Sequence, residues 1–115
     1  MDYETIARKA KDANEHEAHE LYLYAINTAE LYHRLVDPTT KSLARHAKRG
    51  NYDMKRAVVA WKRVADETAK LYAKDFAHES DWNRIFSVAD RCAAAIHLED
   101  AERENVFWKV QHKEV

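Results

Sequence analysis

Apolar residues recur at steps of three and four over most of the chain, which is the period of one face of an α-helix. Over residues 3–36 only one charge, Glu17, interrupts the stripe, so the pattern predicts one long helix. From Leu21 onward apolar positions cover most of the circumference, which indicates a central helix contacted from several sides. Residues 1–20 are richer in Ala, Lys and Glu, and we expect them to form a projecting helical extension. The stripe consists of Ile6, Ala10, Ala13, Leu21, Tyr24, Thr28, Leu31 and Leu35.

The pair Asp37-Pro38 interrupts this pattern. Proline cannot continue a preceding helix but suits the first turn of a new one, and an aspartate before it can accept a free backbone N–H. The pair therefore predicts a break, followed by a short helix over residues 38–49. Gly50 is the expected end of that helix, because glycine adopts positive φ without a steric penalty.

Asp53 is the next candidate cap, and a third helix is predicted over residues 54–76. Residues 82–86 are expected to form one short helical turn between this helix and the next. We expect the core to combine the apolar faces of these helices. The residues predicted to be buried are Leu21, Tyr24, Leu31, Trp61, Val64, Tyr72 and Ile96.

Ser87 and Asp90 have the spacing of a capping box, in which each side chain bonds to the other residue's backbone N–H. A fourth helix should therefore begin near Val88. The apolar tail over residues 106–110 is either a continuation of this helix or a strap over the core.

Composition supports a helical reading of the whole chain. The 115 residues include one Gly and one Pro, whereas a β-rich fold of this length needs many turn residues. We therefore predict an all-α fold: one domain over residues 1–115, a small bundle of three long helices plus short ones, with the helix over 3–36 central and a tail over 106–115. No apolar run approaches the roughly 20 residues that cross a bilayer.

Cys92 is the one cysteine of the chain, so an internal disulfide and a cysteine zinc cluster are both excluded. It lies among alanines with no histidine on its face, which favours a buried, inert thiol over a nucleophile. Cysteine usage of this kind is typical of a reducing compartment, and we expect a cytoplasmic location.

A set of helix-packing residues and caps runs from Glu30-Leu31-Tyr32 through Tyr52-Asp53 and then includes Ala57, Trp61, Val64 to Glu67, Ala69, Tyr72 to Lys74 and Phe76. With these residues the chain resembles a loose family of short, uncharacterised, all-helical proteins from bacteriophage and mobile-element genomes. The likeness covers residues 22–104. It implies an accessory protein acting in the cytoplasm of a host cell and carries no catalytic role.

Charge is distributed unevenly along the chain. Residues 1–40 carry a net charge of −4 and residues 64–115 carry −4, whereas residues 41–63 carry +7. The basic segment spans the predicted second helix, its turn and the start of the third helix, and we name its cations the basic corner. Its members are Lys41, Arg45, Lys48, Arg49, Lys55, Arg56, Lys62 and Arg63.

The basic corner has three readings. A cationic patch steers encounter with an acidic protein surface or with phosphates. The plainer reading is a solvated surface that the acidic flanks partly neutralise. Between the two partners, an acidic protein is favoured, because the acidic segments on either side would repel a duplex lying across the bundle.

Two acid-x-x-His pairs, Glu30/His33 and Asp75/His78, have the spacing used in carboxylate-bridged di-iron bundles. Two such pairs are close to what chance gives in a chain with 20 acids and 7 histidines. The acid- and histidine-rich stretch over residues 12–20 lacks the zinc-protease spacing, and its i,i+4 pairs, such as Asp12/His16, suit an exposed helix. We therefore predict no metal and no cofactor.

The aromatic residues toward the C-terminus provide a second candidate interface. Short apolar elements beside loops can hold a partner, and Trp is enriched at interface hot spots. Core packing is the favoured reading. These residues are Trp82, Phe86, Phe107 and Trp108.

No phosphate-binding glycine loop, nucleophile elbow or paired-carboxylate signature is present, so the sequence does not indicate an enzyme. The leading hypothesis is a non-enzymatic interaction protein that binds and sterically blocks a host or defence-system macromolecule, an anti-CRISPR-type inhibitor in its sharpest form. The alternative is a nucleic-acid-associated accessory protein that uses the basic corner. A di-metal helical-bundle protein is the third hypothesis.

Overall fold

The computed structural model describes residues 1–76 and 86–112 of the chain. Helix accounts for 84% of these residues and none of them is in a strand, which confirms the prediction of an all-α fold. No helix among them has the length and apolar character needed to cross a membrane. In chain order the elements are α1 (Tyr3–Ala10), α2 (Glu15–Asn27), α3 (Ala29–Leu31), the π-helix η1 (Tyr32–Val36), α4 (Asp37–Lys48), α5 (Met54–Asp75) and α6 (Val88–Gln111).

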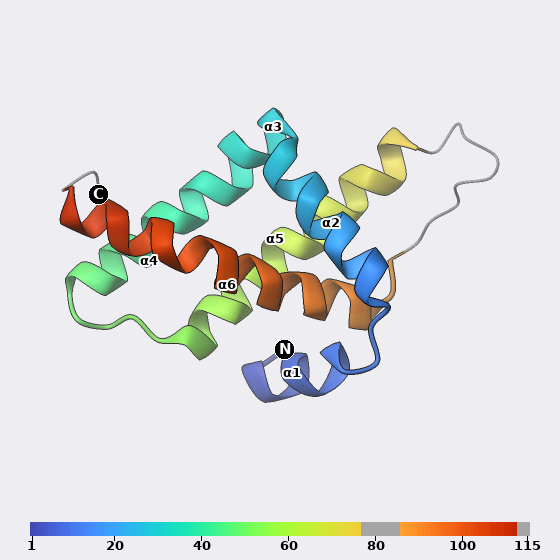
Figure 1. Ribbon diagram of the computed structural model, residues 1–115, viewed down its shortest axis with the longest axis horizontal. Coiled ribbons are helices and arrows are strands. Elements are labelled where there is room, and N and C mark those ends of the chain that lie inside the picture. The colour runs from blue at the N-terminus through green and yellow to red at the C-terminus, as the bar shows by residue number, and fades with distance from the viewer. Residues whose placement is uncertain (77–85, 113–115) are drawn as a thin grey trace.

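The central element is α6, which runs across the middle of the molecule and packs against α5, α2, α1 and α4 (Figure 1). The prediction that a helix over residues 3–36 is central is therefore wrong. The small side chains of Cys92, Ala94 and Ala95 are buried on α6 and let neighbouring helices approach closely. The two long helices of the described chain are α5 and α6, not three as expected.

The predicted N-terminal helix is divided into α1 and α2, although its apolar stripe continues through the break. α1 ends at Ala10, and Asn14 caps a new helix by accepting a hydrogen bond from the backbone N–H of Glu17. The backbone N–H of Asn14 in turn donates to Asp90 at 3.0 Å. This long-range bond fixes the turn against α6. The N-terminal residues do not project, because Ile6 is fully buried and α1 packs on α6 and α5.

A second difference concerns Pro38, where the helix continues instead of breaking. The chain passes through the π-helix η1 directly into α4, with Asp37 in the right-handed helical region. Proline lacks the N–H that an α-helix would use and clashes with the carbonyl four residues earlier. A π-turn, which widens the helix by one residue, relieves this conflict. The break in the chain lies earlier, at Thr28, whose ψ of 109° is extended.

Asp37 is not a cap, as the sequence suggested, but an anchor for α4. Its carboxylate pairs with Lys41 at 3.0 Å and with Lys109 of α6 at 3.5 Å. Burial acts to raise the pKa of Asp37, but the hydrogen bonds and charges of the two lysines outweigh it and hold the pKa below its ordinary value. Gly50 ends this helical segment with φ +75°, as predicted.

The starts of α5 and α6 agree with the sequence. Asp53 accepts a hydrogen bond from the N–H of Lys55 at the start of α5. Ser87 and Asp90 form the full capping box at the start of α6. The apolar tail is a continuation of α6, because this helix extends to Gln111 and buries Val106. The short turn predicted over residues 82–86 falls mostly outside the described residues.

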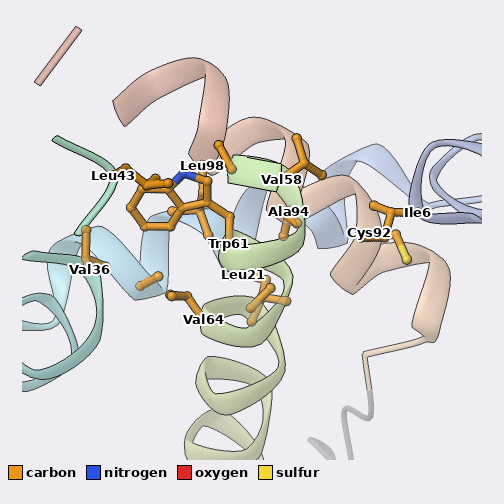
Figure 2. Close-up of a cluster of buried hydrophobic side chains, with 14 of the residues drawn as sticks. Ile6, Leu21, Val36, Leu43, Val58, Trp61, Val64, Cys92, Ala94 and Leu98 are labelled. Carbon is orange, nitrogen blue, oxygen red and sulfur yellow. The ribbon is translucent and has the colours of Figure 1, made fainter. Parts of the chain in front are cut away.

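The core lies where α5 and α6 cross, and Trp61 is its largest fully buried side chain. Figure 2 shows its ring beside Leu43, toward the end of the cluster that also holds Val36, whereas Ile6 and Cys92 lie at the other end. Five of the seven residues predicted to be buried are so, whereas Tyr24 and Ile96 are only partly buried. The five are Leu21, Leu31, Trp61, Val64 and Tyr72.

Candidate functional site

The basic corner is not a uniform surface, because half of its cations are paired with carboxylates. An exposed pair of this kind contributes little to stability, but it lowers the local positive charge that a partner would meet. The pairs are Lys41–Asp37, Lys55–Glu4, Arg56–Asp53 and Lys62–Asp66, with nitrogen–oxygen distances of 3.0, 3.4, 4.0 and 2.8 Å.

Lys62 belongs to the interior and not to a binding surface. Only 8% of this residue is exposed, and its ammonium donates to both carboxylate oxygens of Asp66 at 2.8 Å. Arg91 of α6 donates to the same carboxylate at 2.9 Å. Asp66 therefore bridges α5 and α6, and the prediction that Lys62 is a binding residue is not supported by its position.

The remaining cations of the basic corner are exposed, and within the described chain none of their side chains takes part in a hydrogen bond or an ion pair. Three of them lie at the C-terminal end of α4 and its turn, where a positive charge also complements the helix dipole. The fourth lies on α5. They are Arg45, Lys48, Arg49 and Arg63.

These cations face two different surfaces. Lys41, Arg45 and Lys48 follow one another along α4 at helical spacing and form an exposed stripe. The neighbouring positions Ser42 and His46 are turned by about 100° around the helix axis and face α5 instead. The structure therefore separates an outer α4 stripe from the cations that lie between α4 and α5.

Between α4 and α5 lies a groove with a volume of about 480 Å³. Its arginines come from both sides, Arg56 and Arg63 from α5 and Arg34 from η1, and His46 of α4 also lines it. We call this feature the α4–α5 groove. Two carboxylates, Asp53 and Glu67, also line it, so its rim carries a net positive charge of one even with His46 neutral.

The floor of the groove is apolar. Leu43 and Val64 are core residues that reach the groove from below, and Leu35, Pro38 and Ala60 extend the apolar surface. A concave apolar floor with a few convergent polar groups is the usual composition of a binding site. The arrangement can bind an occupant that is apolar on one side and anionic on the other.

Tyr52 closes one end of the groove and is held rigidly from the side of α6. Its hydroxyl donates to the buried carboxylate of Glu99 at 2.9 Å, and Arg103 donates to the same carboxylate. Burial, together with the hydrogen bond to Glu99 and its charge, raises the pKa of Tyr52 to about 12. The phenol therefore stays neutral near pH 7, and the turn that carries it is fixed to α6.

Sequence reasoning missed Arg34 and His46. A signal is present, because residues 34, 38, 42 and 46 recur at steps of four. Interpreting Pro38 as a helix break hides it. Arg56 and Arg63 were included in the basic corner, but their shared face with Ala60 was not recognised as the wall of a groove.

The described aromatic candidates divide into one core residue and two exposed residues. Phe86 is 2% exposed and belongs to the core, where it contacts Tyr72 edge to face. Phe107 and Trp108 are 43% and 46% exposed near the end of α6. Phe107 contacts the ring of Tyr52 at 5.1 Å, so this exposed pair lies close to one end of the groove. Trp82 lies outside the described residues.

The described members of the acid–histidine pairs, Glu30, His33 and Asp75, do not face the interior. Glu30 and His33 are exposed, and Glu30 pairs with Arg34 at 3.0 Å. Asp75 accepts a hydrogen bond from Tyr24, and its partner His78 lies outside the described residues. The positions of Glu30 and His33 do not fit a di-metal centre inside the bundle.

One group on α2 has metal-ligand character: ligand atoms of His16, Glu17 and Glu20 lie within 4.8 Å of one another. All three residues are at least partly exposed, and both glutamates interact with other groups. Asp12, which the sequence paired with His16 on one helix, lies in the turn before α2. These residues form a surface cluster.

Cys92 is fully buried, as the sequence indicated. Burial raises the pKa of its thiol and disfavours the reactive thiolate. Its Sγ lies 3.8 Å from the sulfur of Met1, so the thiol helps to hold the N-terminus against α6.

Comparison of the chain with protein-family models, with curated proteins and with solved structures finds no match. What the described residues define is a helical domain with a cation-lined groove.

Proposed function

We propose that this protein is a non-enzymatic interaction protein that binds an acidic surface of another macromolecule and blocks it sterically. The observation that carries the proposal is the set of exposed cations without a partner in the described chain, Arg45, Lys48, Arg49 and Arg63. Cations that have no carboxylate of their own are available for a partner. The resemblance to proteins of bacteriophage and mobile elements suggests a host or defence-system target.

A protein target is favoured over a nucleic acid. Acidic segments with a net charge of −4 lie on each side of the basic segment in the chain. A duplex that extends beyond the basic corner would meet this negative charge, whereas a compact acidic protein surface would not. Long-range attraction would also speed encounter with such a surface at low salt.

The test is capture of partners from host lysate with two charge-reversed baits. Arg45→Glu/Lys48→Glu changes the basic corner. Lys70→Glu/Lys74→Glu makes the same change in net charge on exposed lysines of α5 outside it. The proposal expects a protein that the wild type and the Lys70/Lys74 variant both retain and that the Arg45/Lys48 variant loses. Equal capture by all three baits would contradict it.

The alternative function is binding to nucleic acid through the same four free cations. Each neutralised phosphate adds about −0.9 to the slope of log affinity against log salt, so four contacts give a slope near −4. A mobility-shift titration with duplex DNA at several salt concentrations measures this slope. Tight, steeply salt-dependent binding that Arg45→Glu/Lys48→Glu abolishes would favour the alternative over a protein target.

A further inference from the structure

We infer that the α4–α5 groove binds an acidic, amphipathic segment of the partner protein, with apolar side chains on the groove floor and carboxylates at the arginines of the rim. This inference rests on the proposed function, because it specifies how an acidic partner would be recognised. It adds a second contact surface to the exposed α4 stripe, and it names the kind of segment that fits.

The rim is suited to carboxylates. Arg63 has no hydrogen-bond or ion-pair partner within the described residues, and Arg34 and Arg56 have only exposed, weakly held ones. A guanidinium offers a planar fork that matches a carboxylate with two parallel hydrogen bonds. Three arginines in one groove can therefore donate hydrogen bonds to carboxylates of a partner. Only two weak, exposed ion pairs within the chain would be lost.

The floor argues for a peptide over a phosphate polymer. Leu35, Pro38 and Ala60 offer apolar surface in the groove, and Leu43 and Val64 lie almost buried beneath it. A duplex presents phosphates on a wide, rigid cylinder and would leave this floor uncovered. A polypeptide can place large apolar side chains between its acidic ones and cover both.

The length of the groove indicates the size of the segment. Its lining on α5 runs from Arg56 to Glu67, which is about 16 Å at a rise of 1.5 Å per residue. This length corresponds to about three turns of a helix. A helix in a groove uses apolar anchors at steps of three and four residues. The expected segment is therefore a short helix with one apolar face bordered by Asp and Glu.

The test is selection from a displayed library of random 16-residue peptides for binding to the folded wild-type protein. Such a selection does not require the partner to be identified. We expect enriched peptides to combine Asp or Glu with large apolar residues at helical spacing. Their affinity, measured by fluorescence anisotropy, should fall at least tenfold for Arg56→Glu/Arg63→Glu. Ala60→Phe, which fills the floor without changing charge, should weaken the same peptides comparably.

Two exposed lysines of α5 outside the basic corner provide the matched control. Lys70→Glu/Lys74→Glu should leave the affinity of the selected peptides within about twofold, because those residues do not line the groove. Circular dichroism and thermal melting verify that each variant is folded. If Ala60→Phe unfolds the protein, the arginine variant still decides the question, since Arg56 and Arg63 are exposed.

The outcomes separate this inference from the proposed function. Peptides without acidic enrichment, or peptides whose binding the groove variants leave unchanged, would overturn the groove inference. If the captured partner is lost with Arg45→Glu/Lys48→Glu but kept with both groove variants, the proposed function holds and the inference fails. If neither set of variants affects the partner, both fail.

Discussion

Helix α5 has two faces with different roles. One face carries Trp61 into the core, and another face carries Arg63, two residues further along the chain, into the α4–α5 groove. The core face is determined by hydrophobic periodicity within α5 itself. The groove face becomes part of a binding surface only because α4 lies opposite it. The comparison shows why packing residues can be identified in one helix, whereas a binding surface depends on the position of a second helix.

The strongest test of this comparison replaces one residue from each face. Trp61→Ala should lower the free energy of unfolding by roughly 3–5 kcal/mol, because it removes buried apolar surface and leaves a cavity. Arg63→Ala should change it by no more than about 0.5 kcal/mol, as expected for an exposed residue. Urea denaturation of both variants provides the measurement. Similar losses for the two variants would contradict the division of α5 into two faces.

The buried Glu99 of α6 holds Tyr52 at one end of the groove. Glu99→Ala removes the acceptor of Tyr52 and Arg103, and hydrogen bonds to a charged group contribute about 1.5–3 kcal/mol. We expect a loss of stability in that range. The pKa of Tyr52 should also fall toward 10, which ultraviolet titration of tyrosine detects. An unchanged tyrosine titration would show that Glu99 does not hold the end of the groove.

Alkaline pH should loosen both regions together. The pKa values of Tyr24 and Tyr52 are raised to about 12. Burial is the largest cause, and the hydrogen bonds to Asp75 and Glu99 are the next largest. An unfolded tyrosine ionises near pH 10. The stabilisation from these tyrosines is therefore complete below pH 10 and is lost as pH rises toward 12. Denaturation midpoints measured from pH 9 to 12 should fall, and less so in Tyr24→Phe/Tyr52→Phe.

The smallest expected effect comes from a local cap. Ser87→Ala removes one half of the capping box of α6 and should cost about 1 kcal/mol. Ser87→Thr keeps the hydroxyl and should cost less, which makes it the matched control. Thermal melting distinguishes the two variants. If Ser87→Ala costs as much as Trp61→Ala, the start of α6 is held by more than its cap.

The parts of the fold that sequence predicted are those with local causes. The caps at Asp53 and Ser87, and the positive φ of Gly50, each depend on a few neighbouring residues. The break before Asn14 was missed although Asn14 and Glu17 have suitable spacing for a cap, because the apolar stripe runs through it. What fixes that turn is the bond from Asn14 to Asp90, which lies 76 positions away in the chain.

The candidate site was predicted less completely for the same reason. Charge density alone identified the basic corner, including Arg56 and Arg63. It did not reveal that Lys62 pairs with Asp66 in the interior, since burial depends on the position of α6. Nor did it reveal that Arg34 and His46 complete the groove, since their approach depends on a helix that continues through Pro38.

The π-turn at Tyr32–Val36 also limits which lengths of chain this fold can accept. Deleting one residue, such as the exposed His33, would remove the extra residue and allow a regular α-helix. A π-turn takes one residue more than an α-turn to cover about the same rotation, so the fully buried Leu31 would keep its direction toward the core. The regular helix would instead restore the clash between Pro38 and the carbonyl four residues earlier. The more regular helix would therefore be the less stable protein.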